Sequence, residues 1–201
     1  VLGARLGHCL FYDPKFYLSA PLEILKVWKG GLASHGGGIG IFLSLFLFCR
    51  KYHYSYRYIL DRIAITVAAA GFFIRLGNFF NSEIVGKVSN APWAVVFQQR
   101  LRELGPAARH PAQLYESLAY LSIFLFLGAF YLKRQEKLKN GQIVGLFLSL
   151  VFTARFLIEF VKVRQADFSV DWSISMGQIL SIPMILIGIF CLITAKPSEQ
   201  G

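Results

Sequence analysis

The chain has 201 residues, 55% of them hydrophobic, and a mean hydropathy of +0.52, which excludes an ordinary soluble domain. Its formal net charge is +10, from 21 Lys and Arg against 11 Asp and Glu. A basic balance of this size is typical of nucleic-acid-binding proteins, but here the basic residues gather in short links between apolar runs. That placement indicates a membrane protein, and we expect no nucleic-acid partner.

The chain begins with a segment that is not predicted to cross a bilayer. Residues 1–12 are apolar and contain Gly, like the end of a helix, and we expect an N-terminal portion with at least one more span to precede them. Residues 13–32 mix aromatic residues and lysines with Pro and Gly, so they are too interrupted to span. Aromatic rings and lysines suit headgroup depth, which predicts an interfacial arm over 13–32, either re-entrant or lying on the surface.

The rest of the chain consists mainly of apolar runs of about 20 residues, the length that crosses a hydrocarbon core of about 30 Å. The 81–113 link is broken by Pro and Gly, and we expect it to form a small external cap. These features predict an all-α polytopic membrane protein with about five transmembrane helices in one membrane domain over 1–201. The predicted spans are 35–52, 59–80, 114–132, 143–163 and 174–195.

The links between the spans differ in charge, which predicts the orientation. The 50–62 and 133–139 links are dense in Lys and Arg and fall on the same side, so this side is predicted to be cytoplasmic. The 81–113 link is more dilute in basic residues, and the 164–173 link carries acidic residues. We therefore expect both of these links outside the cytoplasm and the C-terminus inside.

Neither a metal site nor a cofactor site is predicted. Cys9, Cys49 and Cys191 are scattered and fit neither a disulfide framework nor a metal-ligand spacing. His35 and His110 have no partner at the spacing of a metal motif, and the chain has no Walker loop or dinucleotide fingerprint. We expect the cysteines to be small apolar packing residues.

Polar and ionisable residues lie at the ends of the apolar runs that face the predicted external side, where they are costly and therefore of functional interest. His35 opens the first run and is followed by glycines at 36–38 and 40. The backbone N–H groups of a helix N-terminus favour an anion such as phosphate, and a histidine exchanges a proton near neutral pH. The alternative is that the glycines serve helix packing and His35 is an interfacial hydrogen-bonding residue.

The end of the second run carries Arg75, Asn78, Asn81 and Glu83. Arg75 and Asn78 are three residues apart and share a helix face. The guanidinium group is suited to binding phosphate, the amides to binding ester or glycerol oxygens, and Glu83 to orienting Arg75 or accepting a proton. The alternative is a helix-capping network with an Arg–Glu pair.

The third run opens with Arg109 and His110 before Pro111, which suits the first turn of a helix. Gln113 and Glu116 then share a face, with Tyr115 between them. A motif that caps the helix and anchors it at the interface is a serious alternative to a substrate site here.

In the fourth run, Arg155 and Glu159 are four residues apart and are predicted to be in salt-bridge reach. Such a pair would act as a gate or headgroup clamp. A structural ion pair that fixes helix packing is the alternative.

Together these segments resemble the prolipoprotein diacylglyceryl transferase family, whose signature reads G-R-x-G-N-F-x-N-x-E-x-x-G. Here Ile74 stands at the first position in place of Gly. Other segments are similar to family segments in the same order: Gly3–Gly7, Ser34–Gly37, Arg109–Glu116 and Arg155–Phe160. The matching signature segment is Ile74-Arg75-Leu76-Gly77-Asn78-Phe79-Phe80-Asn81-Ser82-Glu83-Ile84-Val85-Gly86.

The resemblance implies a reaction in the bacterial plasma membrane, with the site toward the external face. The diacylglyceryl group of phosphatidylglycerol moves to the lipobox cysteine of an exported prolipoprotein, a thioether forms and glycerol-1-phosphate leaves. Membrane lipid and prolipoprotein signal peptides are the implied partners, and no cofactor is implied. The implied catalytic residues are His35, Arg75, Arg155 and Glu159. The implied substrate-binding residues are Arg75, Asn78, Asn81, Glu83, Gly86, His110, Gln113, Tyr115 and Glu116.

Two other classes of function remain open. A transporter would use the same charged residues as a pathway, but it would normally place charges and broken helices near the midplane. A non-catalytic lipid-binding protein would explain Arg75 and the glycines but not the number of distinct proton-capable groups. The placement of charges at one face favours the enzyme.

Overall fold

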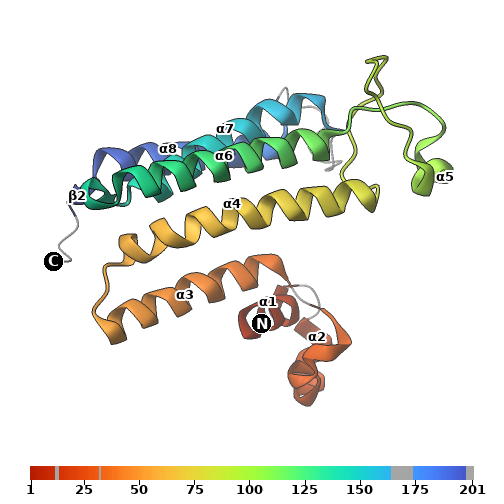
Figure 1. Cartoon of the computed structure of the whole chain (residues 1–201). Helices are drawn as coiled ribbons and strands as arrows, with labels where there is room; N and C mark the ends of the chain where they lie inside the picture. Colours follow the sequence, from red (N-terminus) through yellow and green to blue (C-terminus); the bar gives the residue numbers. More distant parts are fainter. Residues whose placement is uncertain (12–13, 32, 164–173, 198–201) are drawn as a thin grey trace. The chain divides into compact units, whose positions relative to one another are not determined.

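The computed structural model describes residues 1–11, 14–31, 33–163 and 174–197. The predicted link at 164–173 therefore lies outside the described residues. The chain divides into two compact units, Val1–Ile59 and Leu60–Gly201 (Figure 1). The single membrane domain over 1–201 stays a prediction.

The helices account for most of the described chain. The first unit contains α1 (Leu2–Phe11), α2 (Pro14–Ser19), η1 (Pro21–Leu25), η2 (Val27–Lys29) and α3 (Ser34–Tyr52). Helix α4 (Tyr56–Phe80) begins at the end of this unit and runs into the second. The second unit continues with η3 (Gln98–Arg100), α5 (Leu101–Leu104), α6 (Ala112–Arg134), η4 (Gln135–Lys137), β1 (Lys139–Asn140), α7 (Gln142–Ile158), η5 (Glu159–Val161), α8 (Met176–Ile193) and β2 (Lys196–Pro197).

In the first unit, glycines allow α1 and α3 to cross at close range. A Cβ on Gly36 would lie 2.2 Å from the carbonyl oxygen of Gly3 and 2.9 Å from the Cα of Gly7. A Cβ on Gly3 would in turn lie 3.1 Å from the Cα of Gly40. Any larger residue at these positions would force the backbones apart. Gly36 and Gly40 therefore have a packing role, as the alternative interpretation of this glycine run expected.

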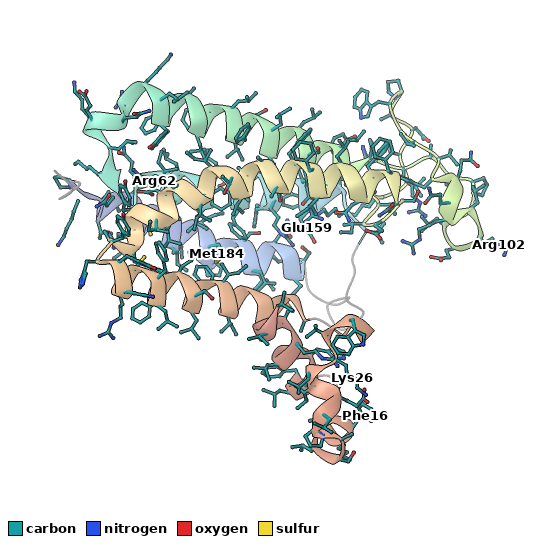
Figure 2. The ribbon with its side chains drawn as sticks, turned by 60° about the horizontal axis from the view of Figure 1, so that its bottom comes forward. Phe16, Lys26, Arg62, Arg102, Glu159 and Met184 are labelled. Atoms are coloured by element: carbon teal, nitrogen blue, oxygen red, sulfur yellow. The ribbon has the colours of Figure 1, made fainter. Side chains whose placement is uncertain are left out.

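The predicted arm at 13–32 is built from α2, η1 and η2, and Arg5 of α1 holds its second half. Arg5 is 3% exposed, and its guanidinium group donates to the carbonyl oxygens of Ile24 at 3.0 Å, Gly30 at 2.6 Å and Glu23 at 2.6 Å. Arginine suits this position because the three nitrogens of its planar guanidinium group reach several acceptors at once. The helices of this segment are short, with six, five and three residues, and the interfacial arm stays a prediction. Figure 2 labels Phe16 and Lys26 within it.

In the second unit, α4, α6 and α7 share one apolar core. Ala64 and Ala68 of α4 present small side chains to larger residues of α6, including Tyr120 and Leu127. A Cβ on Gly71 would lie 2.9 Å from the Tyr120 ring, so α4 approaches α6 through its small residues. The cap around α5 lies beyond one end of these helices, and β1 and β2 pair antiparallel at the other end (Figure 1).

Helix α8 packs against α7 through a second set of small residues. A Cβ on Gly188 would lie 2.8 Å from the backbone nitrogen of Ser149 and 2.9 Å from the carbonyl oxygen of Gly145. Gly145 and Ser149 are four residues apart and so lie on one face of α7. Helix α8 begins with a capping box, in which the Ser175 hydroxyl accepts from the backbone N–H of Gln178 and the Gln178 side chain accepts from the backbone N–H of Ser175.

The start of α7 is capped by a side chain from a distant part of the chain. Gly141 at its N-cap has φ 96° and makes no side-chain cap of its own. Asp61 of α4 is 6% exposed and accepts from the backbone N–H groups of Gly141 and Val144, both at 2.7 Å. A carboxylate here satisfies two N–H groups and complements the positive end of the helix dipole.

The predicted spans are confirmed as helices with bounds close to those expected, and the fold class is that of an all-α polytopic membrane protein. In the described part of the chain, four helices are long and apolar enough to cross a membrane: Tyr56–Phe80, Ala112–Lys137, Gln142–Val161 and Met176–Ile193. The predicted span at 35–52 is α3, which is helical but is not among these four. Its glycine-rich first turns and the charges of Arg50 and Lys51 in its last turn lower its hydropathy.

Candidate functional site

At the cap end of the second unit, three extended segments hold the ends of the helices together. Residues 85–89 lie between 108–110 on one side and 161–163 on the other, with antiparallel bridges Gly86–Lys162 and Val88–Arg109. The backbone N–H of Gly86 donates to the His110 carbonyl at 3.0 Å, and that of Lys87 to the Val161 carbonyl at 2.8 Å. This pairing joins the end of α4, the start of α6 and the end of α7.

Gly86, the last residue of the family signature, sits at the centre of this arrangement. A Cβ at this position would lie 2.5 Å from the His110 carbonyl oxygen and 2.9 Å from that of Val161. Because both neighbours are backbone atoms, neither can move without separating the segments. The residue is glycine because two chains approach it from opposite sides, and its predicted contact with substrate stays a prediction.

The turn after α4 holds Glu83 between two residues with left-handed backbone. Ser82 has φ 57° and Ile84 has φ 54°. For a β-branched residue such as Ile84 this conformation is strained, at a cost of about 1–3 kcal/mol, and such strain gathers at functional sites. The side-chain amide of Gln113, which is fully buried in α6, donates to the backbone carbonyl of Glu83 and so stabilises the turn.

Arg75, Asn78 and Glu83 form a hydrogen-bonded chain at the end of α4. Arg75 Nη1 donates to Asn78 Oδ1 at 3.3 Å, and Asn78 Nδ2 donates to Glu83 Oε2 at 2.7 Å. The contact of Glu83 with Arg75 is therefore made through Asn78. Asn81, also predicted in the site, has an exposed side chain at the same turn. The chain leaves Arg75 partly exposed, with 15% of its side-chain surface accessible.

Beneath Arg75 lies a buried cluster of charges from three elements. The Glu116 side chain of α6 is 0% exposed, and its Oε2 atom lies 3.1 Å from Arg75 Nε, an ion pair without hydrogen-bond alignment. Its Oε1 atom accepts from Lys162 Nζ at 2.8 Å. Lys162 Nζ also lies 3.5 Å from Glu159 Oε2. Two cations and two carboxylates thus alternate as Arg75, Glu116, Lys162 and Glu159.

The predicted pairing of Arg155 with Glu159 is not among the ion pairs of the described residues, where Glu159 pairs with Lys162. Glu159 is the C-cap of α7, and its backbone N–H donates to the Arg155 carbonyl oxygen, so the backbone keeps the helical spacing although the two side chains are not paired. Arg155 instead lies within electrostatic range of the Tyr120 hydroxyl, as Glu116 and Arg75 do. Arg155 is thus near the same cluster, and its part in the site stays a prediction.

A second polar group lies where the cap meets α6. The Tyr115 hydroxyl accepts from Trp93 Nε1 at 2.7 Å and lies 3.1 Å from His110 Nδ1. Arg109 donates to the carbonyl oxygens of Gly86 at 3.4 Å and Leu104 at 3.2 Å, so it holds the cap to the extended segments. His110 and Tyr115 are thus brought together at the entrance to α6, beside the Gly86 turn.

The second unit brings together most of the residues predicted for the site. His35 belongs to the first unit, in the first turn of α3, and its side chain lies outside the described structure. Its place beside Arg75 therefore stays a prediction. Three residues were missed: Lys162, Trp93 and Tyr120. Lys162 follows Glu159 by three residues in an apolar stretch, which is a signal that sequence reasoning could have used.

No group of three or more His, Cys, Asp or Glu residues is placed to hold a metal ion within the residues that the structure describes. The site instead offers guanidinium, ammonium and amide groups, which are suited to an anionic phosphate and to hydroxyl groups. It lies at one end of apolar helices. The fold and the site together define an integral membrane protein with a cluster of charged and polar groups at one end of its helix bundle.

Comparison with known proteins identifies the family. The family model for prolipoprotein diacylglyceryl transferase matches residues 1–194, and the chain belongs to this family. A phosphatidylglycerol–prolipoprotein diacylglyceryl transferase of Tolumonas auensis is 48% identical, over 100% of this chain and 76% of the relative. A protein of the same name from Chloroherpeton thalassium is 46% identical, over 100% of this chain and 74% of its own. One from Bacteroides fragilis is 45% identical, over 94% of this chain and 72% of the relative.

Proposed function

We propose that this protein transfers the diacylglyceryl group of phosphatidylglycerol to the lipobox cysteine thiol of a prolipoprotein, as the first step of bacterial lipoprotein maturation. Family membership supports the reaction, and relatives at 45–48% identity carry the name of this activity. The observation that carries the proposal structurally is the partly exposed Arg75, held over a buried ion-pair cluster at one end of apolar helices.

In the proposed reaction, the thiolate sulfur of the cysteine attacks the glyceryl carbon that carries the phosphate ester. A C–S bond forms as the C–O bond breaks, and the electron pair leaves on the phosphate of glycerol-1-phosphate. A free thiol is a weak nucleophile, so a base must take its proton. His35 is the residue proposed for this step, because imidazole exchanges protons near neutral pH.

Arg75 and Arg155 are proposed to stabilise the leaving phosphate. Both lie within electrostatic range of the Tyr120 hydroxyl, Arg75 from α4 and Arg155 from α7. Preorganised cationic donors placed where negative charge develops are among the largest contributors to catalysis. Asn78, Asn81 and Glu83 are proposed to bind the glycerol hydroxyls, because their amide and carboxylate groups lie on the exposed side of Arg75.

We place the protein in the bacterial plasma membrane with this site toward the external face. In the second unit, the Arg62 guanidinium lies over the Tyr131 ring at 5.7 Å, near the basic residues that end α6. These groups are at the opposite end of the unit from Arg75 and Glu116. The positive-inside rule then assigns the basic end to the cytoplasm and the polar site to the outside.

The test is a transfer assay with the protein in phosphatidylglycerol liposomes and a lipobox peptide that contains one cysteine. The expected product is a peptide heavier by one diacylglyceryl group, absent when the cysteine is replaced by serine or the lipid by phosphatidylethanolamine. Uptake of a solute without peptide modification would favour a transporter instead. Lipid binding without modification would favour a non-catalytic lipid-binding protein.

Arg75→Ala is expected to reduce the transfer rate by about 100-fold or more, the effect of removing one donor to a developing oxyanion. Arg75→Lys should restore little, because an ammonium group lacks the planar fork of guanidinium. Arg102→Ala is the matched control, since Arg102 is an exposed arginine in the cap (Figure 2). Equal rates in the Arg75→Ala and Arg102→Ala variants would show that Arg75 does not contact the phosphate.

A further inference from the structure

Lys162 is the cation of the buried charge cluster to which the reaction described above gives no task. Only 5% of its surface is exposed, although lysine is almost never buried unless it is paired. Its ammonium group contacts Glu116 at 2.8 Å and Glu159 at 3.5 Å. Its backbone bridges to Gly86, so the residue is fixed at both ends.

The position of Lys162 affects what Arg75 can do. Glu116 is a fully buried carboxylate with two cationic neighbours, Arg75 at one oxygen and Lys162 at the other. The contact with Lys162 is a hydrogen bond, whereas the contact with Arg75 lacks hydrogen-bond alignment. Glu116 therefore accepts its hydrogen bond from Lys162, and Arg75 is ion-paired to it through Nε alone.

Without the ammonium group, the balance of the cluster would change. The two cations and two carboxylates sum to zero, and removing Lys162 leaves one negative charge in excess. An unpaired buried carboxylate is costly, so Glu116 would draw Arg75 into a full bidentate pair. An anionic headgroup would then meet a net negative site and a guanidinium already occupied.

We propose that Lys162 is a positioning residue: it neutralises Glu116 and Glu159 and so leaves Arg75 available to the phosphate of an anionic lipid headgroup. This inference rests on the proposed function for the identity of the lipid. The inference predicts an effect on lipid binding as well as on turnover, so the inference and the proposed function can fail separately.

The test uses two measurements on the purified protein. One is the rise in Tm that phosphatidylglycerol produces relative to phosphatidylcholine, which reports binding without any reaction. The other is the peptide transfer rate per mole of folded protein, with KM for phosphatidylglycerol. Lys133→Met is the matched control, because Lys133 is an exposed lysine at the far end of α6.

Lys162→Met is expected to raise KM for phosphatidylglycerol at least tenfold and to abolish the lipid-dependent rise in Tm. Lys162→Arg should keep a KM near the wild-type value and most of the lipid-dependent rise in Tm, because arginine keeps the positive charge. Lys162→Met combined with Glu116→Gln should recover lipid binding relative to Lys162→Met alone, because the carboxylate that captures Arg75 is gone. A purely structural lysine would show no recovery, since the second change removes a further contact.

The outcomes separate the two proposals. A Lys162→Met protein with wild-type KM and wild-type stabilisation by phosphatidylglycerol would overturn the positioning role. So would a double variant that binds the lipid no better than Lys162→Met. A wild-type protein that is stabilised by phosphatidylglycerol but transfers nothing would overturn the proposed function and leave the binding role of Lys162 intact.

Discussion

The cap that Asp61 provides for α7 offers a direct test of how the bundle is held together. Asp61 lies in α4, and Gly141, the N-cap residue of α7, follows it by 80 residues. Replacing Asp61 with alanine removes the acceptor for two backbone N–H groups, those of Gly141 and Val144. Since the carboxylate is buried, water would replace it poorly, and both N–H groups would lose a partner at the same time.

The size of the effect follows from those two bonds. A hydrogen bond to a charged group contributes about 1.5–3 kcal/mol, and loss of a helix N-cap costs about 0.5–2 kcal/mol. The two estimates overlap because they describe the same contacts, so Asp61→Ala is expected to cost about 2–4 kcal/mol. Asp61→Asn keeps one acceptor of the same shape and should cost about half as much.

Thermal unfolding in detergent micelles, followed by circular dichroism, measures this. Glu136→Gln is the control, because Glu136 is an exposed acidic residue near the same end of the bundle. We expect a fall in Tm for Asp61→Ala, a smaller fall for Asp61→Asn and none for Glu136→Gln. Equal Tm values for Asp61→Ala and Glu136→Gln would refute the claim that α4 caps α7.

Two further predictions concern contacts between helices and within the site. Gly188→Ala should destabilise the protein by about 1–3 kcal/mol in the same unfolding assay, as overpacking does, because its Cβ would meet backbone atoms of α7 at 2.8 and 2.9 Å; an unchanged Tm would mean that α7 and α8 do not approach as described. A double-mutant cycle on the transfer rate should show coupling between Glu159 and Lys162, which lie 3.5 Å apart, and near-additivity between Glu159 and Arg155. The reverse pattern would restore the pairing predicted from sequence.

The sequence by itself determined the helices and the gathering of polar groups at their ends. Apolar runs of sufficient length are local features, so the bounds of α4, α6, α7 and α8 were predicted closely. The spacing of Arg75 and Asn78 was also local, and the two side chains are hydrogen-bonded as their shared helix face implied. For α3 the sequence predicted the helix, but its glycines and terminal charges lower its hydropathy, and it is not among the four helices apolar enough to span a membrane.

The tertiary structure alone decided which charges meet. Glu116 is 46 residues from Lys162, Asp61 is 80 residues from Gly141, and Gly86 is held between two segments that follow it in the chain. Arg155 and Glu159 keep the helical backbone spacing that the prediction used, but among the described residues the ion-pair partner of Glu159 is Lys162. Periodicity reports which residues share one helix face, but a buried charge pairs with whatever group the packing of other elements brings within reach.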